Sequence, residues 1–143
     1  MNQAVEMALP EVVELRVPSR AEWVGLARLA AATVANRLRF SIEEIEDVKL
    51  AVAEACTAVI QHEPHGEFIA LTCEALNDSL RIRVHDSGLH GPQAAERQRM
   101  NFEEARIAGL GIFLIRTLMD EVSYDVHPAH GTDLLMVKRP GGS

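Results

Sequence analysis

Apolar residues near the start of the chain follow two spacings in turn, the first typical of a strand and the second of a helix. The segment VVELRV alternates apolar and polar positions, which predicts a strand that ends at Pro18. Ser19 and Glu22 have the spacing of a capping box, so we expect a helix to begin there. The apolar positions at helical spacing that follow are Trp23, Leu26, Ala27, Ala30, Val34 and Leu38.

A second helix is expected after Ser41, which has the capping-box spacing to Glu44. It should run to about His62, because Pro64 and Gly66 then end the pattern. One face of this helix is predicted to pack against the core. Its apolar stripe consists of Ile45, Val48, Val52, Ala55 and Val59.

The second half of the chain predicts four more strands and one more helix. The segments FIALTCEAL and LRIRVHD alternate around Asn77–Asp78, which is typical of an antiparallel hairpin. Residues 87–108 show no pattern, and a connection of this length in a compact domain is most often a functional lid. GLGIFLIRTLMDEV then predicts a helix entered through glycines, and residues 122–126 and 133–138 predict two last strands.

Helices that each bury one face, together with mostly antiparallel strands, favour a two-layer α/β sandwich. We expect a mixed, mostly antiparallel sheet covered on one face by three helices. The length of 143 residues suits one domain over 1–143, with loose ends at 1–10 and 139–143.

The composition narrows the possible environments and partners. A net charge of -7 without basic runs argues against nucleic acid, which requires clustered Lys and Arg. Neither a signal peptide nor an apolar stretch long enough to cross a bilayer is evident. Cys56 and Cys73 lie in apolar segments and are interpreted as buried thiols of a reducing compartment. We therefore expect a cytoplasmic protein.

Three stretches contain residues that could carry chemistry. Glu54 borders the apolar stripe of the second helix. Asp86 and Gly88 end a strand, where a carboxylate can accept a hydrogen bond from an amine and a glycine lets a ligand approach the backbone. Gly109 and Gly111 open a helix, whose free N–H groups suit phosphates. Each stretch alone also fits a solvated carboxylate, a simple turn or an ordinary helix start, whereas their order and spacing as a set is more specific.

The set resembles the cytoplasmic anti-sigma-factor serine kinases of bacterial stress response and sporulation, which have a GHKL-type ATPase fold. IEDVKLAVAEACT is similar to the N box of that family, VHDSG to its first glycine box, and GLGIFLIRTLMDEV to its second glycine box and the following helix. The resemblance extends from EWVGLARLA to GTDLLMVK, which is nearly the whole chain. It implies ATP and Mg²⁺ as ligands.

Residue roles follow from the resemblance. Glu54 would be the general base that deprotonates a substrate serine. Asp86 would bind the adenine amino group, with Gly88 and Thr132 nearby.

Further implied roles concern the phosphates and a protein partner. Gly109 and Gly111 would bind the phosphates through their N–H groups, and Arg106 would reach the terminal phosphate. Arg28 would contact a sigma factor, although a solvated helix arginine fits that position equally well. The other implied partners are an anti-anti-sigma factor and a second copy of this chain.

Ala58 departs from the family pattern, because the N box is named for an asparagine at this position whose oxygen helps hold Mg²⁺. A methyl supplies no ligand, and Thr57 and Gln61 lie on other faces or a turn further on. Two hypotheses therefore remain open. One is an anti-sigma factor that phosphorylates a serine of its anti-anti-sigma partner, and the alternative is a catalytically inactive partner-switching module. The catalytic domain of a sensor histidine kinase fits less well, because no phosphoacceptor segment precedes the domain.

Two histidine pairs have an H-x-x-H spacing, His62 with His65 and His127 with His130. Proline and glycine neighbours place both pairs at a helix end or in a turn. We therefore do not expect a transition-metal site there.

Overall fold

The computed structural model describes residues 9–61, 66–87, 111–127 and 131–141. Residues 111–118 also form a helix. In chain order, the other elements are β1 (Glu11–Pro18), η1 (Ala21–Trp23), α2 (Val24–Ala35), α3 (Ile42–Gln61), β2 (Phe68–Leu76), β3 (Ser79–Asp86), β4 (Glu121–His127) and β5 (Gly131–Lys138).

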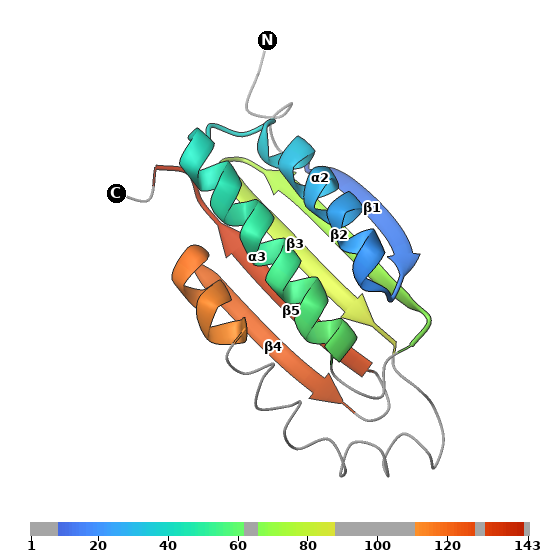
Figure 1. Cartoon of the computed structure of the whole chain (residues 1–143). Coiled ribbons are helices and arrows are strands. Elements are labelled where there is room, and N and C mark those ends of the chain that lie inside the picture. Colours follow the sequence, from blue (N-terminus) through green and yellow to red (C-terminus); the bar gives the residue numbers. More distant parts are fainter. Residues whose placement is uncertain (1–8, 62–65, 88–110, 128–130, 142–143) are drawn as a thin grey trace.

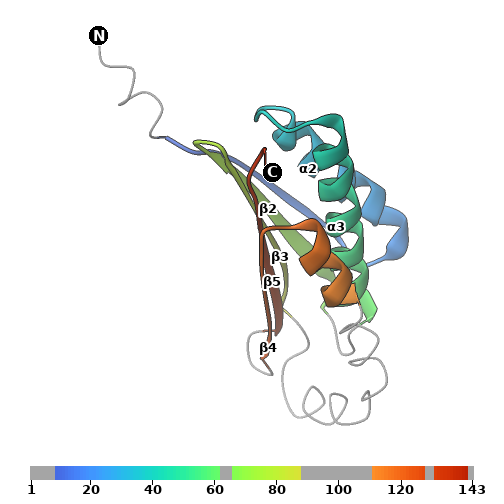
Figure 2. The ribbon, with the colours of Figure 1, turned by 90° about the vertical axis from the view of Figure 1, so that its left-hand side faces the viewer.

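The strands form one sheet in the order β1-β2-β3-β5-β4, and each of these neighbouring pairs is antiparallel. The helices α2, α3 and 111–118 all lie on the same face of the sheet (Figures 1 and 2). The predicted two-layer α/β sandwich is therefore confirmed. Within the described part of the chain, no helix has the length and apolar character needed to cross a membrane.

The predicted hairpin is β2 and β3, which pair from Leu76 opposite Ser79 to Ile69 opposite Asp86. Asn77 opens the turn with a φ of 57°, a conformation that asparagine tolerates better than most residues. The side chains of β3 that face the helices are almost fully buried. They are Leu80, Ile82, Val84 and Asp86.

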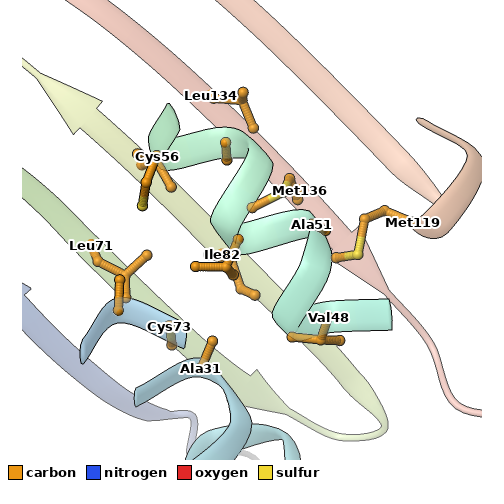
Figure 3. Close-up of a cluster of buried hydrophobic side chains, with 14 of the residues drawn as sticks. Ala31, Val48, Ala51, Cys56, Leu71, Cys73, Ile82, Met119, Leu134 and Met136 are labelled. Carbon is orange, nitrogen blue, oxygen red and sulfur yellow. The ribbon is translucent and has the colours of Figure 1, made fainter. Parts of the chain in front are cut away.

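The core lies between this sheet face and α3 (Figure 3). The apolar stripe predicted for α3 is buried, with only Ile45 remaining partly exposed. Burying one Val or Leu side chain contributes about 1.5–3 kcal/mol, so this stripe fixes α3 across the sheet. The buried residues of α3 are Val48, Ala51, Val52, Ala55, Cys56, Ala58 and Val59.

The start of α3 is capped as predicted. The backbone N–H of Glu44 donates to Ser41 Oγ at 3.1 Å, and the backbone N–H of Ser41 donates to Glu44 Oε1 at 2.8 Å. This reciprocal pair is the capping box, and an N-cap of this kind typically contributes about 1 kcal/mol.

The prediction for the first helix is wrong in two respects. Ser19 does not cap it, because the chain passes through η1, whose N-cap residue Arg20 makes no side-chain bond. Trp23 and Leu26 were expected in the buried stripe, yet they are 43% and 42% exposed. Small side chains make up the buried face instead, which allows α2 to approach α3 and the sheet closely. The buried residues of α2 are Ala27, Ala31, Val34 and Ala35.

The last helix ends earlier than its sequence pattern predicts. The described helical residues are 111–118, and β4 already begins at Glu121. The backbone N–H of Asp120 donates to the carbonyl of Val137 at 2.9 Å, so pairing with β5 replaces the helical bonds here. Met119 is buried at this junction and anchors the end of the helix to the core.

Both cysteines are buried and free, as expected. Burial raises the pKa of the Cys56 thiol to about 12, and the nearby Cys73 adds to this effect. Burial likewise raises the pKa of the Cys73 thiol to about 11. Both groups are therefore uncharged at neutral pH and behave as small apolar side chains.

Candidate functional site

Asp86 and Thr132, two of the predicted site residues, lie together at one end of the helix-covered sheet face. Strand β3 and helix α3 end here, and β5 begins here (Figure 1). Asp86 is the last residue of β3 and stands directly opposite Thr132 of β5. Both side chains are buried, with 1% and 5% exposure, and they share the inner face of the sheet.

Asp86 is held by groups from two other segments. Its Oδ1 accepts a hydrogen bond of 2.6 Å from the backbone N–H of Gly66, which lies just before β2. Its Oδ2 accepts one of 3.2 Å from Ser19 Oγ, just after β1. A buried carboxylate needs such donors, because an unsatisfied charge away from water is very costly. The carboxylate is therefore oriented by protein groups on both of its oxygens.

Sequence reasoning missed Ser19 and Gly66 as parts of this site. The sequence pattern predicts a helix cap at Ser19 and a helix terminator at Gly66. Ser19 follows β1 directly and Gly66 precedes β2 by two residues, and these strand ends lie at the same end of the sheet as Asp86. Asp86, the hydrogen-bond partner of Ser19, lies 67 positions away in the sequence, and no local pattern connects the two residues.

Gly131 brings β5 close to the end of β3. Its φ is +83°, and a Cβ there would overlap the carbonyl oxygen of Asp86 and lie 2.5 Å from the carbonyl carbon of Ser87. Only glycine satisfies both conditions.

On the opposite sheet face, Arg83 donates two hydrogen bonds to Asp133, of 2.7 and 3.1 Å. This hydrogen-bonded carboxylate raises the pKa of the Arg83 guanidinium.

Glu54 of α3 lies close to Gly111, the first described residue of the helical residues 111–118. A Cβ built on Gly111 would lie 3.6 Å from Glu54 Oε2, an ordinary van der Waals distance. The structure therefore brings together two residues that are 57 positions apart and that the sequence had assigned to one site. The carboxylate of Glu54 is only partly buried.

Ala58 follows Glu54 by one turn of α3 and is 3% exposed. Its methyl packs in the interior and offers no oxygen to a ligand. Among the residues that the structure describes, no group of three or more His, Cys, Asp and Glu side chains could hold a metal ion. A protein-held Mg²⁺ at position 58 does not fit this chain.

Several predicted residues lie outside the described part of the chain. These are Gly88, Arg106, Gly109, His62, His65 and His130, together with residues 88–108 of the expected lid. Arg28 is described and is exposed on α2. It therefore belongs to a surface of the molecule and not to the cluster around Asp86.

The donors and acceptors at Asp86 and Thr132 suit a purine that carries an amino group. The carboxylate accepts from an amine, and a hydroxyl can either donate to a ring nitrogen or accept. Apolar side chains surround both residues on the inner face, including Ile69 beside Asp86 and Leu134 next along β5. This end of the sheet therefore places a carboxylate and a hydroxyl side by side on an apolar face.

Comparisons with known proteins show the family of this chain. Residues 17–138 match the family described as "Histidine kinase-like ATPase domain". The chain is 37% identical over 137 residues to "Serine-protein kinase RsbW" of Halalkalibacterium halodurans, covering 90% of this chain and 83% of the relative. It is also 37% identical over 141 residues to proteins of the same name from Bacillus cereus and Bacillus thuringiensis subsp. konkukian, covering 90% of this chain and 84% of each relative. The chain therefore belongs to the histidine kinase-like ATPase family.

Proposed function

We propose that this protein is an ATP-dependent protein serine kinase that regulates a sigma factor by partner switching. ATP as a ligand follows from membership of an ATPase family. The serine-protein kinases to which the chain is similar support the choice of reaction. The single observation that carries the proposal is the approach of the Glu54 carboxylate to Gly111 in the helical residues 111–118.

The two ends of the proposed ATP site have different tasks. Asp86 accepts a hydrogen bond from the adenine amino group, and Thr132 lies beside the ring. The backbone N–H groups at Gly111 face the phosphates, where the partial positive charge of a helix start stabilises negative charge. Gly88, Gly109 and Arg106, which lie outside the described residues, are assigned to the same site by the resemblance.

Glu54 acts as the general base in this proposal. It accepts the proton of a substrate serine hydroxyl, whose oxygen forms a bond to the terminal phosphorus of ATP. The bond from that phosphorus to the bridging oxygen breaks, and ADP leaves. Phosphoryl transfer depends chiefly on positioning and charge stabilisation, so a carboxylate beside the phosphate end is well placed to orient the hydroxyl.

A second candidate function is a partner-switching module without kinase activity. Ala58 favours it, because a buried methyl replaces the oxygen ligand expected for Mg²⁺. A weaker metal anchor should impair the transfer of the phosphoryl group more than the binding of ATP, so both candidates predict nucleotide binding.

The surface of α2 supports the proposed protein partner. Arg28 is exposed, and Leu26 and Leu29 of the same helix are 42% and 62% exposed. Exposed large apolar side chains near a charged one are typical of a protein-binding surface. We assign this surface to the sigma factor and expect an anti-anti-sigma protein to compete for the kinase.

A homodimer is the third proposed assembly, and strand β1 supports it. This strand is at the edge of the sheet, and Val12 and Val13 on it are 47% and 43% exposed. An edge strand with exposed apolar residues is a surface on which a second copy can pair.

Labelled ATP and the anti-anti-sigma protein encoded in the same genome test the proposal. The wild type should transfer label to a serine of that protein. Glu54→Gln should lower the transfer rate by about 100-fold or more, which is the usual contribution of a general base. Its affinity for ATP, measured by calorimetry, should stay within about twofold, because Glu54 interacts with the serine and not with adenine.

Glu43→Gln is the matched control, because it makes the same chemical change on an exposed residue at the other end of α3. It should leave the transfer rate unchanged. ATP binding without any transfer by the wild type would establish the second candidate. An equal effect of both substitutions would contradict the role of Glu54.

A further inference from the structure

Ser19 is fixed in place at the end of β1 and points its hydroxyl at Asp86. Its backbone N–H donates to the carbonyl of Glu67 at 2.9 Å, and the residue is only 6% exposed. Its Oγ donates to Asp86 Oδ2 at 3.2 Å. The Ser19 hydroxyl is therefore held in a fixed position, because the pairing of β1 with β2 makes this segment rigid.

The second oxygen of Asp86 accepts from the backbone N–H of Gly66 at 2.6 Å. The terminal torsion of an aspartate is broad when nothing restrains it. Two donors from different segments, one on each oxygen, fix the plane of this carboxylate.

We infer that Ser19 is a positioning residue, which sets the orientation of Asp86 and thereby the preference of the site for purines with a 6-amino group. The inference rests on the proposed function, in which Asp86 binds adenine. A fixed acceptor recognises an amino group and rejects a 6-oxo group, since two acceptors cannot share a hydrogen bond. A carboxylate free to rotate recognises the amine less well.

The competing explanation is purely structural, with Ser19 tying β1 to β3. The two explanations differ in one measurable quantity, the ratio of affinities for two nucleotides that differ only at position 6 of the purine. These are ATP and purine riboside triphosphate, which lacks the amino group. A structural tie changes both affinities alike, whereas a positioning residue changes only the affinity for ATP.

Calorimetry on wild type, Ser19→Ala and Ser19→Thr tests the inference. Ser19→Ala should weaken ATP binding about 5–10-fold, as expected for one hydrogen bond, and leave the affinity for purine riboside triphosphate unchanged. Ser19→Thr keeps the hydroxyl and should restore the ratio. An affinity ratio that Ser19→Ala leaves at the wild-type value would overturn the inference, even if the variant is less stable. A wild type that binds both nucleotides equally would instead overturn the adenine role of Asp86, whereas failure of the proposed kinase function would appear as absence of label transfer.

Discussion

Replacing Gly131 with alanine should destabilise the protein and displace the end of β3 that carries Asp86. The φ of Gly131 is +83°, where an alanine costs about 1–2 kcal/mol. The new Cβ would also overlap the Asp86 carbonyl oxygen and lie 2.5 Å from the carbonyl carbon of Ser87. Neither backbone atom can rotate away, and relieving such overlap typically costs about 1–3 kcal/mol. The expected loss in the free energy of unfolding is therefore about 2–5 kcal/mol.

Alanine variants at two other glycines separate the cost of the positive φ from the cost of the steric overlap. Gly141 has a φ of +67° with nothing within 4 Å of a built Cβ, and Gly25 has open space without a positive φ. Gly141→Ala should cost at most about 1–2 kcal/mol, whereas Gly25→Ala should stabilise the helix by about 0.5–1 kcal/mol.

Thermal unfolding followed by circular dichroism measures the series. At this chain length 1 kcal/mol corresponds to roughly 4 °C, so Gly131→Ala should lower Tm by about 8–20 °C. Calorimetry should also show weaker ATP binding for Gly131→Ala and not for the other two variants. Equal losses in Tm for Gly131→Ala and Gly141→Ala, with ATP binding intact in both, would refute the close approach of β5 to β3.

Two further predictions concern Ala58 and the buried thiols. Ala58→Asn adds an oxygen ligand and should raise the rate of phosphoryl transfer. In the absence of nucleotide, burial of the new amide should lower the free energy of unfolding by about 1–3 kcal/mol. Single-turnover kinetics and urea unfolding measure both, and an unchanged rate would contradict the metal-ligand explanation. Cys56 and Cys73 should resist alkylation at pH 8 until the protein is unfolded. Because their folded pKa values are raised from 9.0 to about 12 and about 11, the stability that they contribute should be constant below pH 9 and fall as pH rises from there.

The elements with the clearest periodicity were predictable from sequence. The stripe of α3 and the Ser41–Glu44 capping box involve residues three or four positions apart, so the information is local. The hairpin of β2 and β3 is local as well, because Asn77 forms the turn between two alternating segments. Short-range patterns of this kind determine an element before its surroundings are known.

Ser19 shows why other features could not be predicted. Its spacing to Glu22 is the same as that of Ser41 to Glu44, yet its hydroxyl bonds to Asp86. A serine hydroxyl can cap a helix or satisfy a distant carboxylate, and only the packing decides between them. The exposure of Trp23 could not be predicted either, because small residues on α2 form the buried face and leave this large ring largely exposed. Hydrophobicity alone does not indicate how closely two elements approach.

The two ends of the candidate site are held by different parts of the fold, so a change at one end can leave the other end intact. Asp86 is fixed by backbone pairing with β5 and by donors next to β1 and β2. Glu54 depends instead on the approach of α3 to Gly111 in the helical residues 111–118. Because Ala58 lies on α3, the absence of an oxygen ligand at this position should affect only the end of the site that contains Glu54 and Gly111. Loss of the oxygen at position 58 can therefore reduce phosphoryl transfer while the adenine end stays intact, so a kinase and a binding module of this fold differ at the helices and not at the strands.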